Sequence, residues 1–235
     1  MIKLERRCLK IHPSVLVNSV CVALGSCFGM ALGKTIPDGL KKVLFQAVGL
    51  TTIGVGVKMT LDTSNFIVVL LALGFGAIVG ESIDIEEKLS KIGKFSKDSV
   101  KFAKGFVTAT ILFLVGPMTI VGSIRAGLLN DGTLIYVKSV LDLISSIVLA
   151  SLYGIGVLLT SVVVLVVQGG MVLLASQLSF LTNSTYLANF TGVGGLIVLA
   201  IGVRLLELRD IKVGNLLPAL LVSPLIDYLA KYLVK

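Results

Sequence analysis

Long apolar runs separated by short polar segments constrain this chain more than any other feature. Of its 235 residues, 55% are hydrophobic and only 14% are charged, and the mean hydropathy is +1.01. A soluble domain usually carries about 25% charged residues. Apolar runs of about 20 residues are long enough to cross a bilayer as helices. The sequence therefore predicts an all-α integral membrane protein.

The apolar runs predict about eight transmembrane helices. Residues 1–13 form a basic N-terminal tail, and residues 14–235 form a single transmembrane domain. The first run has no convincing small-residue cleavage site and is long enough to span, so we interpret it as a membrane anchor rather than a signal peptide. The expected spans are 14–32, 43–59, 66–83, 106–124, 135–152, 155–176, 189–206 and 215–233.

Two of these runs resemble each other. The second and the seventh align without gaps, so that Gly49 meets Gly195 and Gly56 meets Gly202. We interpret spans 1–3 and spans 6–8 as related copies. The copies are an odd number of spans apart, so they would lie inverted in the membrane. Inverted repeats are typical of secondary transporters, whose binding sites lie near the bilayer midplane between the halves.

Small residues mark the faces along which helices can approach. Gly25, Gly29 and Gly33 recur every fourth residue in the first span, so they share one helical face, which favours close helix packing in lipid. Such surfaces also make a homodimer plausible without specifying one. The three cysteines contain no CxxC pair, and the single His12 has no nearby ligand set, so neither a metal nor a cofactor is expected.

The segment 84–104 separates the third and fourth spans. Its apolar residues recur at helical spacing between six lysines, which predicts one basic amphipathic helix lying on a membrane face. Anionic lipid headgroups are its expected partner. The net charge of +8 is attributed to loops that set topology, not to nucleic-acid binding. Most loop Lys and Arg would share one side of the membrane, but the basic tail would lie on the other, so both orientations stay open.

Polar residues inside the apolar runs are the candidate site. A carboxylate within a span is costly and indicates function by default, and Asp142 is such a residue. Lys138 lies four residues earlier, so the two share a helical face and can pair. The Gly116-Pro117 break predicts freed backbone carbonyls and a half-helix end facing a solute. The expected neutral ligands are Asn18, Gln168 and Asn215, and for Asn18 simple interhelical hydrogen bonding is the alternative.

Several motifs occur in an order that resembles a known family. They are GVGVKM in the second span, LFLVGPMTIVGSIRAG around the break, KSVLDLISSIVLAS around Asp142, and GGLIVLAIGVRLLELR in the seventh span. The chain is similar over residues 14–226 to the prokaryotic inner-membrane family called domain of unknown function 554. The resemblance implies a multi-pass protein of the bacterial or archaeal cytoplasmic membrane and no particular substrate. The family's characteristic polar positions correspond here to Asn18, Arg125, Lys138, Asp142 and Asn215.

These features favour a transporter of a small solute or ion with its site around Asp142 and the broken helix. A channel lined by the same residues is an alternative, as is a non-transporting scaffold or sensor that docks through 84–104. An enzyme is not expected, because no nucleophile arrangement or phosphate-binding motif occurs. A membrane-embedded aspartyl protease would need two aspartates, and Asp142 is the only clear intramembrane one.

Overall fold

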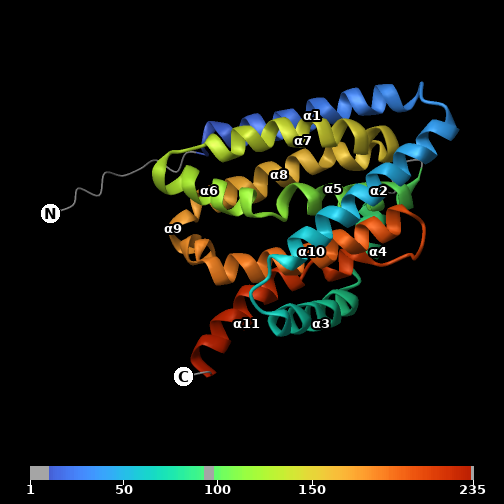
Figure 1. Cartoon of the computed structure of the whole chain (residues 1–235). Coiled ribbons are helices and arrows are strands. Elements are labelled where there is room, and N and C mark those ends of the chain that lie inside the picture. Colours follow the sequence, from blue (N-terminus) through green and yellow to red (C-terminus); the bar gives the residue numbers. More distant parts are fainter. Residues whose placement is uncertain (1–10, 93–97, 234–235) are drawn as a thin grey trace.

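The computed structural model describes residues 11–92 and 98–233, and every regular element in those ranges is a helix (Figure 1). The elements in chain order are α1 (Pro13–Gly33), α2 (Asp38–Leu61), α3 (Phe66–Ile83), α4 (Ile85–Ile92), α5 (Ser99–Leu114), α6 (Pro117–Leu129), α7 (Thr133–Tyr153), α8 (Ile155–Leu173), α9 (Ala175–Leu178), the 3-10 helix η2 (Ser179–Thr182), α10 (Ser184–Leu205), the 3-10 helix η3 (Val213–Leu216) and α11 (Ala219–Leu233).

Six of the described helices are long and apolar enough to cross a membrane, namely α1, α2, α3, α7, α8 and α10. The helices α5 and α6 meet at an angle of 59° and could together make a seventh. The last expected span is divided into η3 and the shorter helix α11, which begins just after Pro218. A proline has no backbone N–H to continue a helical ladder, which explains the division. The chain is thus a multi-pass helical membrane protein, and the count of eight spans stays a prediction.

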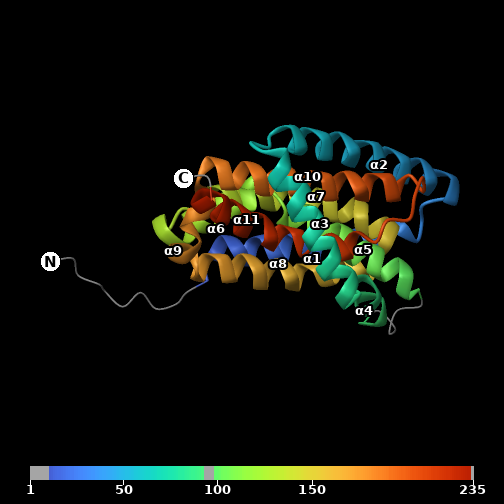
Figure 2. The same ribbon diagram turned by 90° about the horizontal axis from the view of Figure 1, so that it is seen from below.

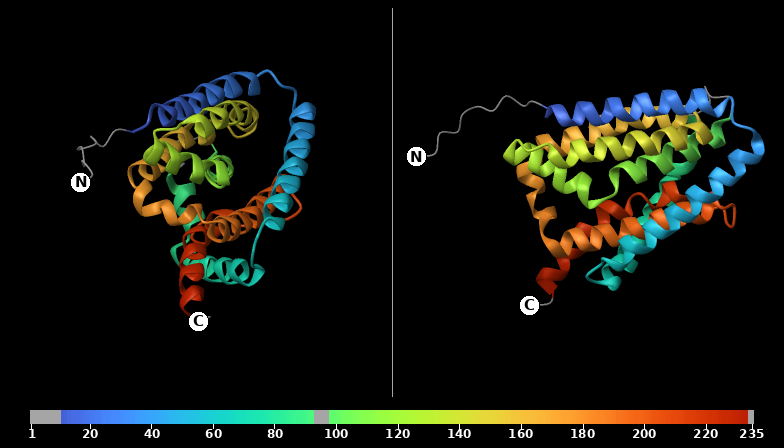
Figure 3. Two further views of the ribbon diagram at one scale, coloured as in Figure 1. Left: turned by 60° about the vertical axis from the view of Figure 1, so that its left-hand side comes forward. Right: turned by 45° about the horizontal axis from the view of Figure 1, so that its top comes forward.

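The first group of helices is organised by the contact between α1 and α7, which lie side by side (Figures 1 and 3). A Cβ added at Gly25 would overlap the carbonyl oxygen of Leu143, and one added at Gly29 would overlap that of Ile147. The predicted glycine face of the first span is therefore confirmed as a packing face. The opposite face of α1 exposes large apolar side chains suited to lipid, at Leu16, Val20, Leu24 and Phe28.

The second group contains α2, α3, α10 and α11 (Figure 2). In the contact between α2 and α10, a Cβ at Gly56 would lie 2.8 Å from Gly195 O, and a Cβ at Gly202 would lie 3.0 Å from Gly49 O. The contact between α3 and α11 is equally close, because Gly76 lies directly against the backbone of Ala219. Small residues thus bring the backbones together in this group as well.

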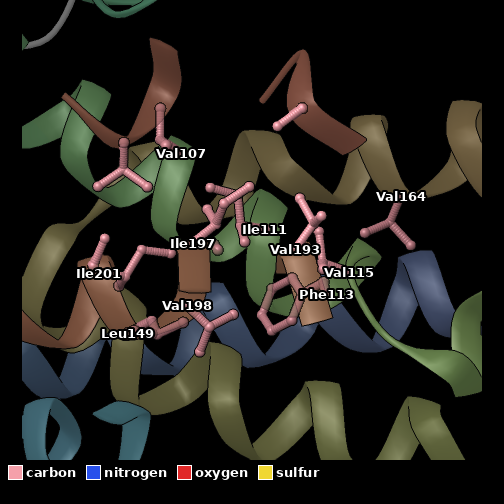
Figure 4. Close-up of a cluster of buried hydrophobic side chains, with 14 of the residues drawn as sticks. Val107, Ile111, Phe113, Val115, Leu149, Val164, Val193, Ile197, Val198 and Ile201 are labelled. Atoms are coloured by element: carbon pink, nitrogen blue, oxygen red, sulfur yellow. The ribbon is translucent and has the colours of Figure 1, made fainter. Parts of the chain in front are cut away.

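An apolar core joins the two groups (Figure 4). It is built on α5, whose buried side chains meet those of α7, α8 and α10. The labelled members are Val107, Ile111, Phe113, Val115, Leu149, Val164, Val193, Ile197, Val198 and Ile201. Because α5 lies at the centre of this core, Phe113 and Val115 before the break are buried, whereas Gly116 is half-buried and Pro117 is exposed.

The helix contacts define two ends of the molecule. At the first, here called the Arg204 end, Gly33 contacts Ser151, Gly105 contacts Tyr153, and Lys104 lies 3.7 Å from Asp210. At the second, here called the His12 end, Gly132 contacts His12 and Ser14, and Gly127 contacts Val172 and Ala175. Since α5 begins at the Arg204 end and α6 finishes at the His12 end, the bent pair runs from one end of the molecule to the other.

The prediction of one amphipathic helix over 84–104 is wrong. Helix α4 ends at Ile92, and α5 begins at Ser99, where the carboxylate of Asp98 accepts a hydrogen bond from Lys101 N at 2.8 Å. Phe102 and Ala103 are buried, and Phe102 lies against Gly156 of α8. Residues 99–104 are therefore the start of an internal helix, while 93–97 lie outside the described residues.

Candidate functional site

The centre of the candidate site is an ion pair on α7. Lys138 Nζ lies 2.5 Å from Asp142 Oδ2, as their spacing of four residues predicted. Both side chains are buried, with exposed fractions of 8% and 7%. Taking two charges out of water is compensated only when further hydrogen bonds satisfy the pair. The surroundings of Lys138 and Asp142 therefore decide what this pair can do.

Two predicted amide residues from other helices extend the hydrogen-bond network of the ion pair. Asn18 of α1 donates through Nδ2 to Asp142 Oδ2 at 3.1 Å. The same nitrogen donates to Gln168 Oε1 of α8, also at 3.1 Å. Both amide residues are fully buried. The structure thus brings together four of the predicted residues from α1, α7 and α8, and we call this set the Asp142 cluster: Asn18, Lys138, Asp142 and Gln168.

The Asp142 cluster keeps unused hydrogen-bonding capacity. Asn18 Oδ1 and Gln168 Nε2 are buried and have no hydrogen-bond partner. A buried polar atom without a partner costs about 1–3 kcal/mol, so such atoms are uncommon in folded proteins. One acceptor and one donor are therefore available to a ligand in the same cluster as a carboxylate and an ammonium group.

The broken helix lies next to the cluster. Helix α5 ends at Leu114, Gly116 is extended, and α6 begins at Pro117. The ring centroid of Phe113, in the last turn of α5, lies 5.8 Å from Lys138 Nζ, within the range of a cation–π contact. The break thus borders the ion pair through an aromatic ring.

The expectation that the break frees its carbonyls is wrong at two positions. Gly116 O accepts from Thr119 N at 3.1 Å, and Phe113 O accepts from the Thr119 hydroxyl at 3.1 Å. Thr119 therefore satisfies the backbone on both sides of Pro117. The break therefore contributes a change of helix direction and the N-terminus of α6 to the site, and the carbonyl oxygen of Gly116 is already hydrogen-bonded.

Asn215 does not join the Asp142 cluster. It lies in η3 at the Arg204 end, where its Oδ1 accepts from Glu86 N at 2.9 Å and its Nδ2 donates to Glu81 Oε2 at 2.7 Å. Lys212 bonds the same Glu81 at 2.8 Å. Asn215 thus joins the end of α3 to α4, and the prediction that it contributes to the central site is wrong, because η3 follows the end of α10.

The Arg204 end also contains a charged cavity of about 370 Å³. Arg204 in its wall is held by Glu86 and, at 3.1 Å, by Asp210. Its lining residues are Asp84, Glu86, Glu87, Val100, Ala103, Arg204, Asp210 and Lys212. None of these residues belongs to the Asp142 cluster. Within the described ranges, no group of three His, Cys, Asp or Glu side chains comes together in a way that could hold a metal ion.

Sequence reasoning overlooked two buried residues. Asp227 on α11 and Asn189 on α10 are buried, and Asn189 Nδ2 donates to Asp227 Oδ1 at 2.7 Å. Asp142 is therefore not the only buried aspartate among the described residues. The signal was present, because Asp227 also interrupts an apolar run.

Comparisons with known proteins agree on the class of this chain. A family model described as "Protein of unknown function (DUF554)" matches residues 13–228. The "Uncharacterized membrane protein YdfK" of Bacillus subtilis is 32% identical over 216 residues, covering 90% of this chain and 93% of that protein. The "Uncharacterized protein YqgA" of Escherichia coli is 28% identical, covering 88% and 92%. No solved structure matches.

Proposed function

Given that this chain belongs to the DUF554 family of membrane proteins, we propose that it transports a small solute or ion through a site around Asp142. The observation that carries the proposal is the buried Lys138–Asp142 pair with one unused acceptor at Asn18 and one unused donor at Gln168. Ionisable residues inside membrane helices usually mark substrate or ion pathways. A pair whose only role was packing would be expected to use all its neighbouring hydrogen-bonding atoms.

The neighbouring break supports a transport role. Helices that are interrupted near the bilayer midplane form the sites of many secondary transporters. The pair α5–α6 contacts α8 at both ends of the molecule, through Gly156 and through Gly127 with Val172. This arrangement favours one broken span over a re-entrant loop. Together with α11, it supports the proposed total of eight spans.

The inverted repeat is part of the same proposal. In the alignment of the two copies, Gly49 corresponds to Gly195 and Gly56 to Gly202. In the structure the contacts are crossed, because Gly56 packs against Gly195 and Gly202 packs against Gly49. A two-fold axis relating the copies would produce these crossed contacts. Asn18 and Gln168, which bond each other, lie on α1 and α8, the first helices of the two proposed copies. A site between the repeats is the usual place for a transported solute.

We propose the cytoplasmic membrane as the location and anionic lipid as a partner of α4. Lys88 and Lys91 of α4 are exposed, although Lys91 is also bonded to Glu87 at 2.7 Å. Basic side chains next to a membrane are attracted to anionic headgroups. We also propose a homodimer, because helix faces rich in small residues allow two copies to pack closely in lipid.

The first experiment is a thermal-shift screen of the detergent-purified protein. The panel contains alkali and alkaline-earth chlorides, buffers of different pH, and small metabolites. A ligand present at 100 times its Kd stabilises the native state by about 2.7 kcal/mol. We expect a stabilising ligand for the wild type and for Asp62→Asn, an exposed control with the same chemical change, but not for Asp142→Asn.

The stabilising ligand is then tested for flux in proteoliposomes. Saturable uptake by the wild type and by Asp62→Asn, lost in Asp142→Asn, would support transport. Unsaturable conductance in planar bilayers would favour the channel. A folded Asp142→Asn protein with unchanged ligand response and uptake would contradict the assignment of the site.

A further inference from the structure

The buried carboxyl group of Asp227 lies outside the Asp142 cluster and has no role in the proposed transport site. Asp227 is on α11, and only 8% of its surface is exposed. Its Oδ1 accepts one hydrogen bond, from Asn189 Nδ2 at 2.7 Å. Its Oδ2 is buried and has no hydrogen-bond partner. An ionised carboxylate with one neutral donor and one empty oxygen is poorly stabilised away from water.

The orientation of Asn189 is determined by its other partners. Its Oδ1 accepts from the Thr63 hydroxyl at 3.1 Å, from Ser64 N at 3.1 Å and from Asn65 N at 2.9 Å. All three donors lie in the turn between α2 and α3. Since reversing the amide would lose these bonds, the NH2 group must face Asp227, and Asn189 can offer only a donor there.

Among the side chains that the structure describes, no opposite charge is paired with Asp227. None of the ion pairs among the described residues includes it. On the elements around it, Asp62 after α2 is exposed and of like charge, while Glu81 of α3 and Arg204 of α10 are engaged at the Arg204 end. Along α11 itself, Tyr228 is adjacent and Lys231 follows one turn later.

A hydroxyl group lies one turn before Asp227 on the same face of α11. Ser223 is fully buried, and its Oγ also has no hydrogen-bond partner. Residues four apart on a helix are neighbours on one face, so Ser223 is within reach of the carboxyl group through a side-chain rotation. Neither oxygen atom has a hydrogen-bond partner, and a serine hydroxyl can both donate and accept a hydrogen bond.

We propose that Asp227 is a proton-binding site, taking its proton from water onto Oδ2. The O–H group formed donates to Ser223 Oγ, while Oδ1 continues to accept from Asn189. A proton removes the buried charge, and neutralisation is the usual response of a carboxyl group that is buried without a countercharge. Since Asn189 also holds the α2–α3 turn, proton binding stabilises the junction of α10, α11 and that turn.

The test is infrared difference spectroscopy of the detergent-purified protein during a pH titration. A protonated carboxyl group has a C=O stretching band that a carboxylate lacks. We expect this band in the wild type, in Asp142→Asn and in Lys231→Ala, and its loss in Asp227→Asn. The band of the wild type should disappear with rising pH in one transition. Lys231→Ala is the control for a salt bridge one turn along α11.

Several results would overturn the proposal. They are a band unchanged in Asp227→Asn, no protonated carboxyl band at any pH, or a band abolished by added NaCl at constant pH, which would indicate a sodium site. If Asp227→Asn fails to fold, Ser223→Ala tests the same assignment, because removing the acceptor must shift the frequency of the band. A band that does not move in Ser223→Ala would then contradict the proposal.

Discussion

At the scale of single residues, hydrogen-bonding demand separates two kinds of buried polar group in this protein. Thr119 and Asn189 use their polar side-chain atoms to hold backbone, as in the break after α5 and the α2–α3 turn. Asn18, Gln168 and Asp227 each keep a buried atom without a partner. A ligand or a proton that binds at the second kind of group can supply the missing hydrogen bond, so we assign the functional sites to these groups.

The Lys138–Asp142 pair gives a test that separates stability from function. Breaking a buried ion pair by removing one partner costs about 3–5 kcal/mol, whereas replacing both with apolar residues of similar size is often neutral. We therefore expect Asp142→Leu to lower the melting temperature in detergent, and Lys138→Met with Asp142→Leu to recover most of the loss without restoring uptake. A double variant no more stable than Asp142→Leu alone would show that the two charges do not compensate each other.

Asp131, in the turn before α7, predicts a dependence on pH outside the membrane spans. Hydrogen bonds from Thr133 and Arg125 lower the pKa of Asp131 to about 2. Its unfolded pKa is about 3.9, so these bonds stabilise the fold fully above about pH 4, and the stabilisation is lost as the pH falls through about 2. The difference in melting temperature between wild type and Asp131→Asn should be constant above that window and shrink within it. A difference that stays constant down to pH 2 would contradict the assignment.

At the scale of helices, glycines decide which helices meet. The predicted face of α1 packs on α7 because Gly25 and Gly29 leave room for the carbonyls of Leu143 and Ile147. Other glycines have no such role, since a Cβ at Gly74 of α3 would meet no atom within 4 Å. Spacing in the sequence suggests which glycines share a face, and the contacts show which of those faces are used.

This contrast gives a matched pair of substitutions. Overpacking a close contact typically costs about 1–3 kcal/mol. We expect Gly29→Leu to lower the melting temperature of the purified protein by several degrees and to reduce its yield from membranes. Gly74→Leu, the same change at an open position, should leave both unchanged. Equal effects of the two substitutions would show that α1 and α7 are not in close contact through Gly29.

At the scale of the whole molecule, the two ends differ in how many Lys and Arg residues they contain. The Arg204 end contains Lys104, Arg204 and Lys212, and α4 with its exposed lysines lies there as well. The His12 end includes the turns at Asn130 and Thr63. An excess of Lys and Arg near the spans favours the cytoplasmic side. We therefore expect the Arg204 end to face the cytoplasm, which the sequence alone left undecided.

Cysteine labelling in cells checks this orientation. The native cysteines are replaced by serine, and single cysteines are introduced as Asp62→Cys, Asn130→Cys or Glu207→Cys. A membrane-impermeant maleimide should label the first two from outside and label Glu207→Cys only after the cells are opened. Labelling of Asp62→Cys and Asn130→Cys from opposite sides would contradict the arrangement of helices itself, whereas reversal of all three would contradict only the orientation.

The sequence by itself determined the membrane class, the family, most helix boundaries, the Lys138–Asp142 pair and the glycine face of α1. Each of these depends on composition or on spacings within one helix, which local geometry dictates. Only the tertiary structure decided that Asn18 and Gln168, 150 residues apart, meet at Asp142, that Asn215 belongs elsewhere, and that Asp227 is buried. It also divided the segment 84–104 between two helices. In a chain with so many apolar residues, hydrophobicity cannot distinguish a lipid-facing helix surface from a packed one. Which helices pack together therefore depends on how closely their backbones fit and on which of the few buried polar groups can form hydrogen bonds with each other.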